Sequence, residues 1–215
     1  MEPVKLVVEL LSETTFGSGQ PTAGEVDIEV QFDRFGCPYI GGKRIHGMLL
    51  DCWLTVGEHA PPDLQKAAME LLGAPGQLLE RPLLRTSRAR LPDDVRGAVK
   101  SAVTREHNPV STRAVRNAFS SVRVQTAEDR PSGAPAEGTL RFRRALRKGL
   151  VFEALVSLSP KAKDREACFK CLAICCLALR RGGTARTRGA GKLCCTLDGD
   201  WAKTVDMAGL KENSQ

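Results

Sequence analysis

The feature that most constrains this chain is a glycine-rich basic segment at residues 182–192. It reads Gly-Gly-Thr-Ala-Arg-Thr-Arg-Gly-Ala-Gly-Lys and lies between two apolar segments, 164–181 and 193–197. Glycine lets the backbone adopt positive φ angles and come close to a ligand. Successive exposed N–H groups in such a loop form a concavity that binds anions, and the arginine and lysine side chains add positive charge. The segment therefore predicts a loop that binds phosphate groups.

This loop does not match two common phosphate-binding motifs. No Ser or Thr follows Lys192, which excludes a nucleotide P-loop. A dinucleotide-binding turn follows a strand, whereas the segment before this loop has helical periodicity. The net charge of +7 favours a polyanionic partner. Because only 5% of the residues are aromatic, extensive base stacking is disfavoured. The pattern indicates nucleic acid bound through its backbone.

The periodicity of apolar residues predicts a mixed α+β fold. Strands are expected at 4–11, 25–33, 119–126, 139–146, 150–159 and 193–197. Helices are expected at 43–56, 63–72, 93–105 and 164–181, the last ending at Gly182. If 25–33 is an added ribbon and the central part is set aside, the order is strand, helix, strand, strand, helix, strand. That order predicts a ferredoxin-like (RRM-like) βαββαβ core, an arrangement common among RNA-binding proteins.

Length and cysteine usage predict one cytoplasmic domain. A chain of 215 residues can bury a full core as a single domain. We expect neither a secretory signal nor a transmembrane segment, because no apolar run is long enough. The eight cysteines include adjacent pairs at 175–176 and 194–195, which is typical of reduced thiols in a cytosol. Cys168 and Cys171 share one helical face with Cys175, so core packing is favoured over structural zinc.

A second basic turn lies near the start of the chain. Gly41-Gly42 precedes the helix expected at 43–56, whose first turn carries Lys43, Arg44 and His46. Basic side chains at a helix N-terminus are unfavourable for the helix dipole. They become favourable when an anion lies there, because the free N–H groups of the first turn also bind it. This turn is therefore a second candidate phosphate site.

Two segments resemble the RAMP proteins of CRISPR systems. Cys37-Pro-Tyr-Ile-Gly-Gly-Lys-Arg-Ile-His-Gly47 is similar to the family signature PYIPG-xx-(I/L)-KG. Residues 180–192 are similar to its C-terminal glycine-rich loop with an R-x-R-G-x-G core. The sequence departs from the signature where Gly41 replaces Pro and His46 replaces Lys. The resemblance covers most of the chain and implies a single RAMP-type domain over 1–215. Within it, an insertion is expected at about 58–118 and a thumb hairpin at about 119–148, with its tip near Ser132.

The resemblance implies a backbone-type, or guide-handle-binding, subunit of a type III effector complex. Its partners would be CRISPR RNA, target RNA and other subunits, including copies of itself or related RAMP subunits, and no membrane. Basic residues would form a ribbon on the hairpin, although such charges are often only solvated. They are Arg113, Arg116, Arg123, Arg141, Arg143, Arg144, Arg147 and Lys148. The residues expected to bind RNA are Lys43, Arg44, His46, Gly47, Arg113, Arg116, Arg123, Gly182, Gly183, Arg186, Arg188, Gly189, Gly191 and Lys192.

Three roles follow from the resemblance. In the first, an acid upstream of the PYI motif promotes Mg²⁺-dependent endoribonuclease cleavage of target RNA, and Asp27 is preferred over Asp33. In the second, the subunit holds the guide handle or caps the complex without catalysis. In the third, His46 with Tyr39 or Lys43 processes guide RNA without metal by general acid–base chemistry.

Overall fold

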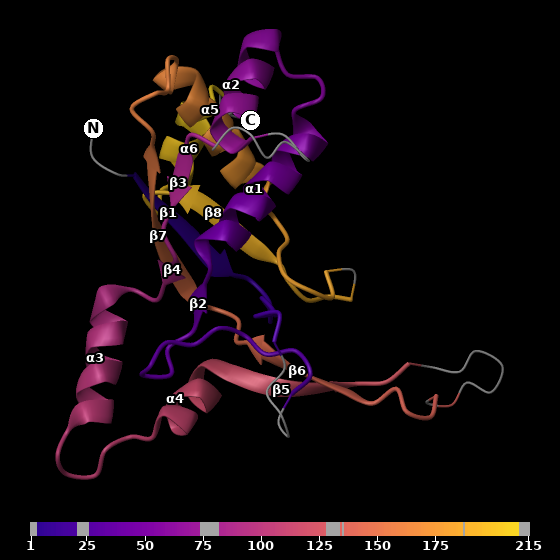
Figure 1. The fold of residues 1–215 in the computed structure, drawn as a ribbon, viewed down its shortest axis with the longest axis vertical. Helices are drawn as coiled ribbons and strands as arrows, with labels where there is room; N and C mark the ends of the chain where they lie inside the picture. The colour runs from indigo at the N-terminus through magenta and orange to yellow at the C-terminus, as the bar shows by residue number, and fades with distance from the viewer. Residues whose placement is uncertain are drawn as a thin grey trace.

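The computed structural model describes residues 4–20, 26–73, 82–127, 134, 136–186 and 188–210. It has the predicted mixed α+β fold, with one antiparallel sheet, surrounding helices and a separate hairpin (Figure 1). The strands of the sheet are β1 (Val4–Leu10), β2 (Tyr39–Ile40), β3 (Leu84–Thr86), β4 (Ala89–Arg90), β7 (Val151–Leu158) and β8 (Leu193–Leu197). No helix within the described residues is both long and apolar enough to cross a membrane.

Strand β1 lies inside the sheet and pairs antiparallel with both β7 and β8. The full order is β2-β4-β7-β1-β8, and β3 also pairs antiparallel with β7. Alternate residues of β1 are buried, because Leu6, Val8 and Leu10 point to the same face of the pleated strand. The short strands β3 and β4 lie within 58–118 and were not predicted from the sequence.

Six helices are present in the described residues. They are α1 (Gly42–Val56), α2 (Pro62–Leu72), α3 (Asp93–Thr104), α4 (Thr112–Phe119), α5 (Arg165–Ala178) and α6 (Trp201–Met207). Helix α5 packs against α1, α2, α6 and β8 at one end of the molecule, whereas α3 and α4 lie with the hairpin at the other (Figure 1). The predicted stop of α5 at Gly182 is wrong, because the helix ends at Ala178. Helices α4 and α6 were not predicted.

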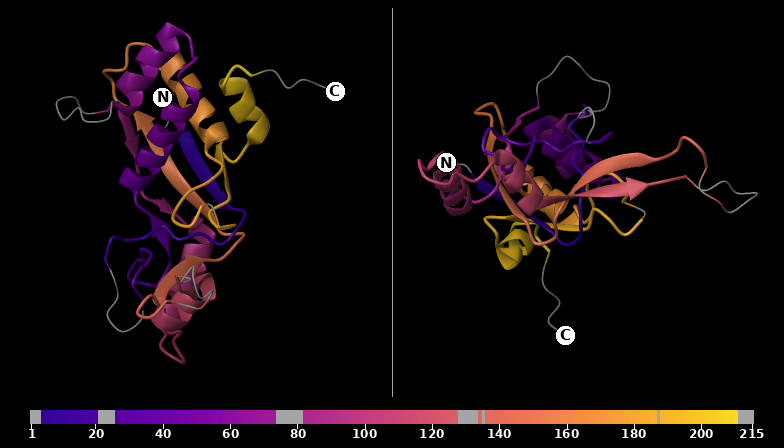
Figure 2. Two further views of the ribbon diagram at one scale, coloured as in Figure 1. Left: turned by 90° about the vertical axis from the view of Figure 1, so that its right-hand side faces the viewer. Right: turned by 90° about the horizontal axis from the view of Figure 1, so that it is seen from below.

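The hairpin consists of β5 (Ser120–Gln125) and β6 (Arg141–Leu146). Its strands pair antiparallel from Ser120↔Leu146 to Gln125↔Arg141, as the sequence predicted. The pair projects from the rest of the molecule (Figure 2, right). The expected tip at Ser132 lies outside the described residues.

The strand predicted at 25–33 is wrong for the described part of that segment. Residues 26–33 form only isolated bridges with different partners, Gly17↔Val30, Ile28↔Arg143 and Phe32↔Pro38. The alternation is also broken, because both Glu29 and Val30 are buried. This segment instead joins the hairpin to the residues before α1.

Candidate functional site

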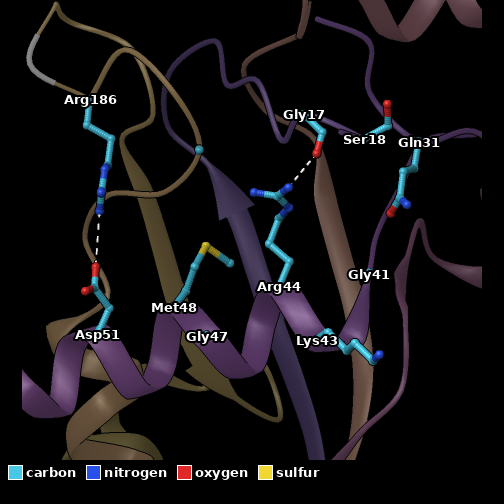
Figure 3. Close-up of a pocket in the computed structure, with 11 residues that line it drawn as sticks. Gly17, Ser18, Gln31, Gly41, Lys43, Arg44, Gly47, Met48, Asp51 and Arg186 are labelled. Atoms are coloured by element: carbon cyan, nitrogen blue, oxygen red, sulfur yellow. Dashed lines mark hydrogen bonds and ion pairs between the residues drawn. The ribbon is translucent and has the colours of Figure 1, made fainter. Parts of the chain in front are cut away.

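A cavity of about 510 Å³ lies where the first turns of α1 face the loop after α5 (Figure 3). Four parts of the chain contribute to it: the loop at 17–18, the segment leading into α1, the exposed side of α1 and the loop at 182–192. The lining residues are Gly17, Ser18, Gln31, Gly41, Lys43, Arg44, Gly47, Met48, Asp51, Gly183 and Arg186.

The start of α1 positions two of the cations. Gly42 lies against the backbone before β4, where a Cβ atom would come within 2.3 Å of the Thr86 carbonyl oxygen. No acidic residue occupies the first turn of this fully described helix, and no side chain caps it. Lys43 and Arg44 are both exposed there, and Arg44 donates a hydrogen bond to the Gly17 carbonyl. The helix therefore begins with two cations and uncapped N–H groups beside the cavity, an arrangement suited to an anion.

The loop at 182–192 is fastened at its base. The Gly182 amide donates to the Gly191 carbonyl at 2.9 Å, and the Thr184 amide donates to the Thr15 carbonyl at 3.0 Å. Glycine is required at 183 and 191, where φ is +78° and +77° and an added Cβ would lie 2.5 Å and 2.3 Å from backbone oxygens. The anchored base holds Gly183 and Arg186 at the cavity, where Arg186 points toward Asp51 (Figure 3).

The charge of the cavity is predominantly positive. Its described lining holds three cationic side chains and one acid, Asp51. Asp51 lies 3.4 Å from an Arg186 nitrogen, and both side chains are more than half exposed. An exposed pair of this kind is weak and screened by salt, so a polyanion can compete with Asp51 for Arg186.

The structure brings five of the predicted RNA-binding residues to this cavity and leaves nine outside its lining. Those lining it are Lys43, Arg44, Gly47, Gly183 and Arg186. Those outside it are His46, Arg113, Arg116, Arg123, Gly182, Arg188, Gly189, Gly191 and Lys192. Gly182 and Gly191 form the base of the loop, where Lys192 also bridges to Arg181 with its side chain exposed. Arg188 and Gly189 are exposed beyond the base.

His46 faces the opposite side of α1. Its Nε2 lies 2.8 Å from the Leu72 carbonyl oxygen at the end of α2, and the ring is half-buried. Tyr39 lines a different cavity. The structure therefore does not assemble the acid–base group of His46 with Tyr39 or Lys43 in one cavity.

Several hairpin arginines already have partners in the protein. Arg123 Nε donates to Glu13 Oε2 at 2.8 Å, and this bond lowers the pKa of the Glu13 carboxyl. Arg144 forms a buried ion pair with Glu29, with its Nε 2.9 Å from Oε1. Arg116 stacks over the Phe32 ring at 5.2 Å. The predicted basic ribbon is therefore partly neutralised by contacts within the chain.

The three acids of the segment 26–33, directly before the PYI motif, have different surroundings. Asp33 accepts hydrogen bonds from the Phe35 and Cys37 amides and shapes the turn before β2. Glu29 is buried against Arg144. Asp27 is exposed, and its Oδ2 accepts the Phe142 amide of β6 at 2.7 Å. Asp27 does not line the cavity, but it lies on the same connecting segment as Gln31, which does.

The cysteines of α5 belong to the core. Cys168, Cys171, Cys175 and Cys176 are fully or almost fully buried. Burial raises the pKa of the Cys171 thiol to about 12, so this group is a protonated thiol at neutral pH. Among the described residues, no group of three His, Cys, Asp or Glu side chains is arranged to hold a metal ion.

Sequence reasoning did not identify several cavity residues. These are Gly17, Ser18, Gln31, Met48 and Asp51. Helical spacing could have found Met48 and Asp51, because they lie one and two turns beyond Arg44 on the same side of α1. The loop at 17–18 carries no local signal for its place beside the helix.

Comparison with solved structures gives matches over nearly the whole chain. A chain of the cryo-EM structure of type III-B Cmr-beta in the apo state matches with a TM-score of 0.67 and 15% identity, covering 93% of this chain and 98% of that one. A chain of Cmr-beta bound to cognate target RNA matches with a TM-score of 0.67 and 14% identity, covering 96% and 99%. A chain of a type IV-B CRISPR complex gives 0.58 and 13%, covering 93% and 91%.

Neither protein-family models nor curated protein sequences match this chain. The similarity is therefore one of fold, at sequence identities of 13–15%. The fold agrees with the resemblance that the PYI segment and the glycine-rich loop indicate, because this chain folds like subunits of type III-B and type IV CRISPR complexes.

Proposed function

We propose that this chain is a CRISPR RNA-binding subunit of a type III effector complex, and that the cavity holds the guide RNA backbone. The observation that carries the proposal is that two basic, glycine-rich turns, far apart in the sequence, line one cavity. The similarity in fold to CRISPR complex subunits supports the same assignment. So does the strand order β8-β1-β7-β3 with α1 and α5 between strands, which is the order of a ferredoxin-like βαββαβ core.

The cavity suits a ribose-phosphate chain better than a base. Among the described residues that line it, none has an aromatic ring on which a base could stack. It offers guanidinium and ammonium groups, which bind phosphates, and close backbone approach at the glycines. Recognition of this kind leaves the bases free, so that pairing with target RNA can supply the sequence specificity.

The first experiment measures RNA binding by the purified chain. We expect small RNA to copurify with it, and we expect Lys43→Ala/Arg186→Ala to weaken binding of a guide RNA. The slope of log K against log salt should fall by about 1.4, because each single-strand phosphate contact contributes about 0.7. The matched control is Lys66→Ala/Lys100→Ala, which removes equal charge from exposed positions on α2 and α3. Equal losses in both variants would contradict the cavity assignment.

We further propose that Asp27 promotes cleavage of the paired target RNA with Mg²⁺. Asp27 is exposed, whereas Glu29 and Asp33 are committed to Arg144 and to backbone amides. Mg²⁺ accepts one or two carboxylates when phosphate oxygens and water complete its shell, so a lone carboxylate fits the ion only with RNA present. When bound, Mg²⁺ would supply charge stabilisation for the attacking and leaving oxygens. Asp27 would hold it beside Phe142 of β6, toward the far end of the paired hairpin strands.

The test is target cleavage by the assembled complex carrying Asp27→Asn. We expect cleavage to fall at least a hundredfold while guide RNA binding is unchanged, and we expect EDTA to abolish cleavage by the unsubstituted complex. Retained cleavage by the complex carrying Asp27→Asn would instead favour a guide-handle-binding or capping subunit. The hydrogen bond that the Phe142 amide donates to Asp27 favours the guide-handle-binding or capping role, because it gives the carboxylate a structural function.

A further inference from the structure

A second cavity, of about 460 Å³, lies beside the PYI segment. The turn at 32–39, the segment at 88–90 and α3 surround it. Four arginines line it, which are Arg34, Arg88, Arg90 and Arg96. The remaining lining residues are Phe32, Asp33, Phe35, Cys37, Pro38 and Tyr39. Within the described part of the chain, it shares no lining residue with the cavity at the start of α1.

Two of these arginines form flat walls with aromatic rings. The Arg88 guanidinium lies 5.1 Å from the centroid of the Tyr39 ring, and Arg34 lies 4.7 Å from that of Phe35. The pairing Tyr39↔Arg90 between β2 and β4 holds the tyrosine beside a further arginine. A guanidinium stacked on a ring keeps its N–H edge free for hydrogen bonds, while its plane and the ring offer surfaces for stacking.

The cations that line this second cavity outnumber its acids, while Asp93 and Glu153 lie in an adjoining cavity that Arg88, Arg90 and Arg96 also line. Asp33 is the only acid among the described residues that line it, and its carboxylate already accepts two backbone amides. Arg96 pairs with Asp93 at 2.8 Å, but its Nε is buried without a hydrogen-bond partner in the described part of the chain. Arg34, Arg88 and Arg90 are exposed. Several guanidinium groups around one hollow repel each other unless an anion lies between them.

We propose that this cavity binds a nucleotide, with its phosphate on the arginines and its base against Tyr39 or Phe35. Phosphate accepts the paired N–H groups of a guanidinium, and a base stacks on an aromatic ring or on a guanidinium plane. The volume lies within the range of small-ligand pockets. An acidic protein segment would use the charge but would leave the ring surfaces without a partner, so the rings favour a nucleotide. The inference does not depend on the proposed function of the first cavity.

The ligand can be a free nucleotide or one nucleotide of an RNA strand, and the experiment separates the two. The probe is 5′-AMP, titrated by calorimetry at low salt, with adenosine and inorganic phosphate as comparison ligands. We expect AMP to bind at least tenfold more tightly than either, because it engages both rings and arginines. Arg88→Ala/Arg90→Ala should weaken AMP binding at least tenfold, whereas the surface control Lys66→Ala/Lys100→Ala should leave AMP binding within twofold. Because the substituted residues are exposed, we expect both variants to fold normally. Circular dichroism spectra and melting temperatures equal to those of the unsubstituted chain would confirm this.

The second arm uses a ten-nucleotide RNA containing 4-thiouridine. If AMP does not bind, the RNA is expected to crosslink to the peptide that contains Tyr39. If Arg88→Ala/Arg90→Ala abolishes this crosslink, the site binds a nucleotide within an RNA strand. Nucleotide binding is overturned if neither probe responds to Arg88→Ala/Arg90→Ala, or if hexaglutamate competes as well as AMP does. The two proposals can fail separately. If Lys43→Ala/Arg186→Ala leaves the affinity for RNA unchanged while Arg88→Ala/Arg90→Ala lowers it, the proposed function is contradicted and this inference is supported.

Discussion

The buried ion pair between Arg144 and Glu29 gives the sharpest stability prediction. Their side chains are 5% and 10% exposed, and Arg144 Nε lies 2.9 Å and 3.1 Å from the two Glu29 oxygens. Glu29→Met removes the Glu29 carboxylate from a buried ion pair, and breaking such a pair on one side costs about 3–5 kcal/mol. For a chain of this length, that loss lowers the melting temperature by about 6–20 °C.

The assay is urea denaturation followed by circular dichroism, with Glu29→Met/Arg144→Met as the control. The double variant removes both charges and keeps comparable volume, so we expect it to recover most of the lost free energy of unfolding. The pair also joins the 26–30 segment to β6, where the Arg144 amide donates to the Ile28 carbonyl at 2.9 Å. A loss below about 1 kcal/mol in Glu29→Met, or a double variant less stable than the single one, would refute the reasoning.

Three further predictions follow from other contacts in the structure. Gly191→Ala should lower the melting temperature more than Gly189→Ala. Both residues have φ of +77°, but only at 191 would the added Cβ lie 2.3 Å from a backbone oxygen. Equal losses would exclude the clash. Arg123 lowers the pKa of Glu13, so Glu13→Gln should destabilise the chain above pH 4.5, with the difference vanishing as pH falls through the lowered pKa; a difference that persists in acid would contradict this. Lys43→Glu should raise the free energy of unfolding, measured without RNA, by about 0.3–1 kcal/mol, because an acid is favourable at the N-terminus of a helix. The same substitution should lower the affinity for RNA in a binding assay.

The elements with long apolar periodicity could be predicted from the sequence. Strands β1 and β7 and helices α1 and α3 occur close to the expected bounds. Each of β1, β7 and α1 buries one regular face. Helix α3 packs the half-buried Val95 and Val99 against the core. Strands β3 and β4 have three and two residues, too few to show a period. They form because β7 offers them an open edge. Tertiary pairing of this kind has no local signal.

The segment before the PYI motif shows how a correct pattern can mislead. Its apolar and polar residues alternate, but the hairpin contacts one side of it and the loop at 17–18 contacts the other. Glu29 is buried because Arg144, more than a hundred positions later, neutralises it. A local pattern cannot contain a partner so distant in sequence. Helix α4, by contrast, had a readable start, since the Ser111 side chain accepts the Ala114 amide.

The place of the basic turns follows from the order of elements rather than from either turn alone. The loop at 182–192 connects α5 to β8, and α1 packs against α5. The chain that leaves the C-terminal end of α5 therefore faces the side of α1. Gly42 against Thr86 and Gly183 against Thr15 then fix both turns by backbone contact. The backbone positions of these cations are therefore fixed near one another, and the exposed Asp51 offsets their repulsion only weakly. A rigid frame that keeps like charges together gains most from a ligand carrying repeated negative charge, which is the electrostatic case for RNA in this cavity.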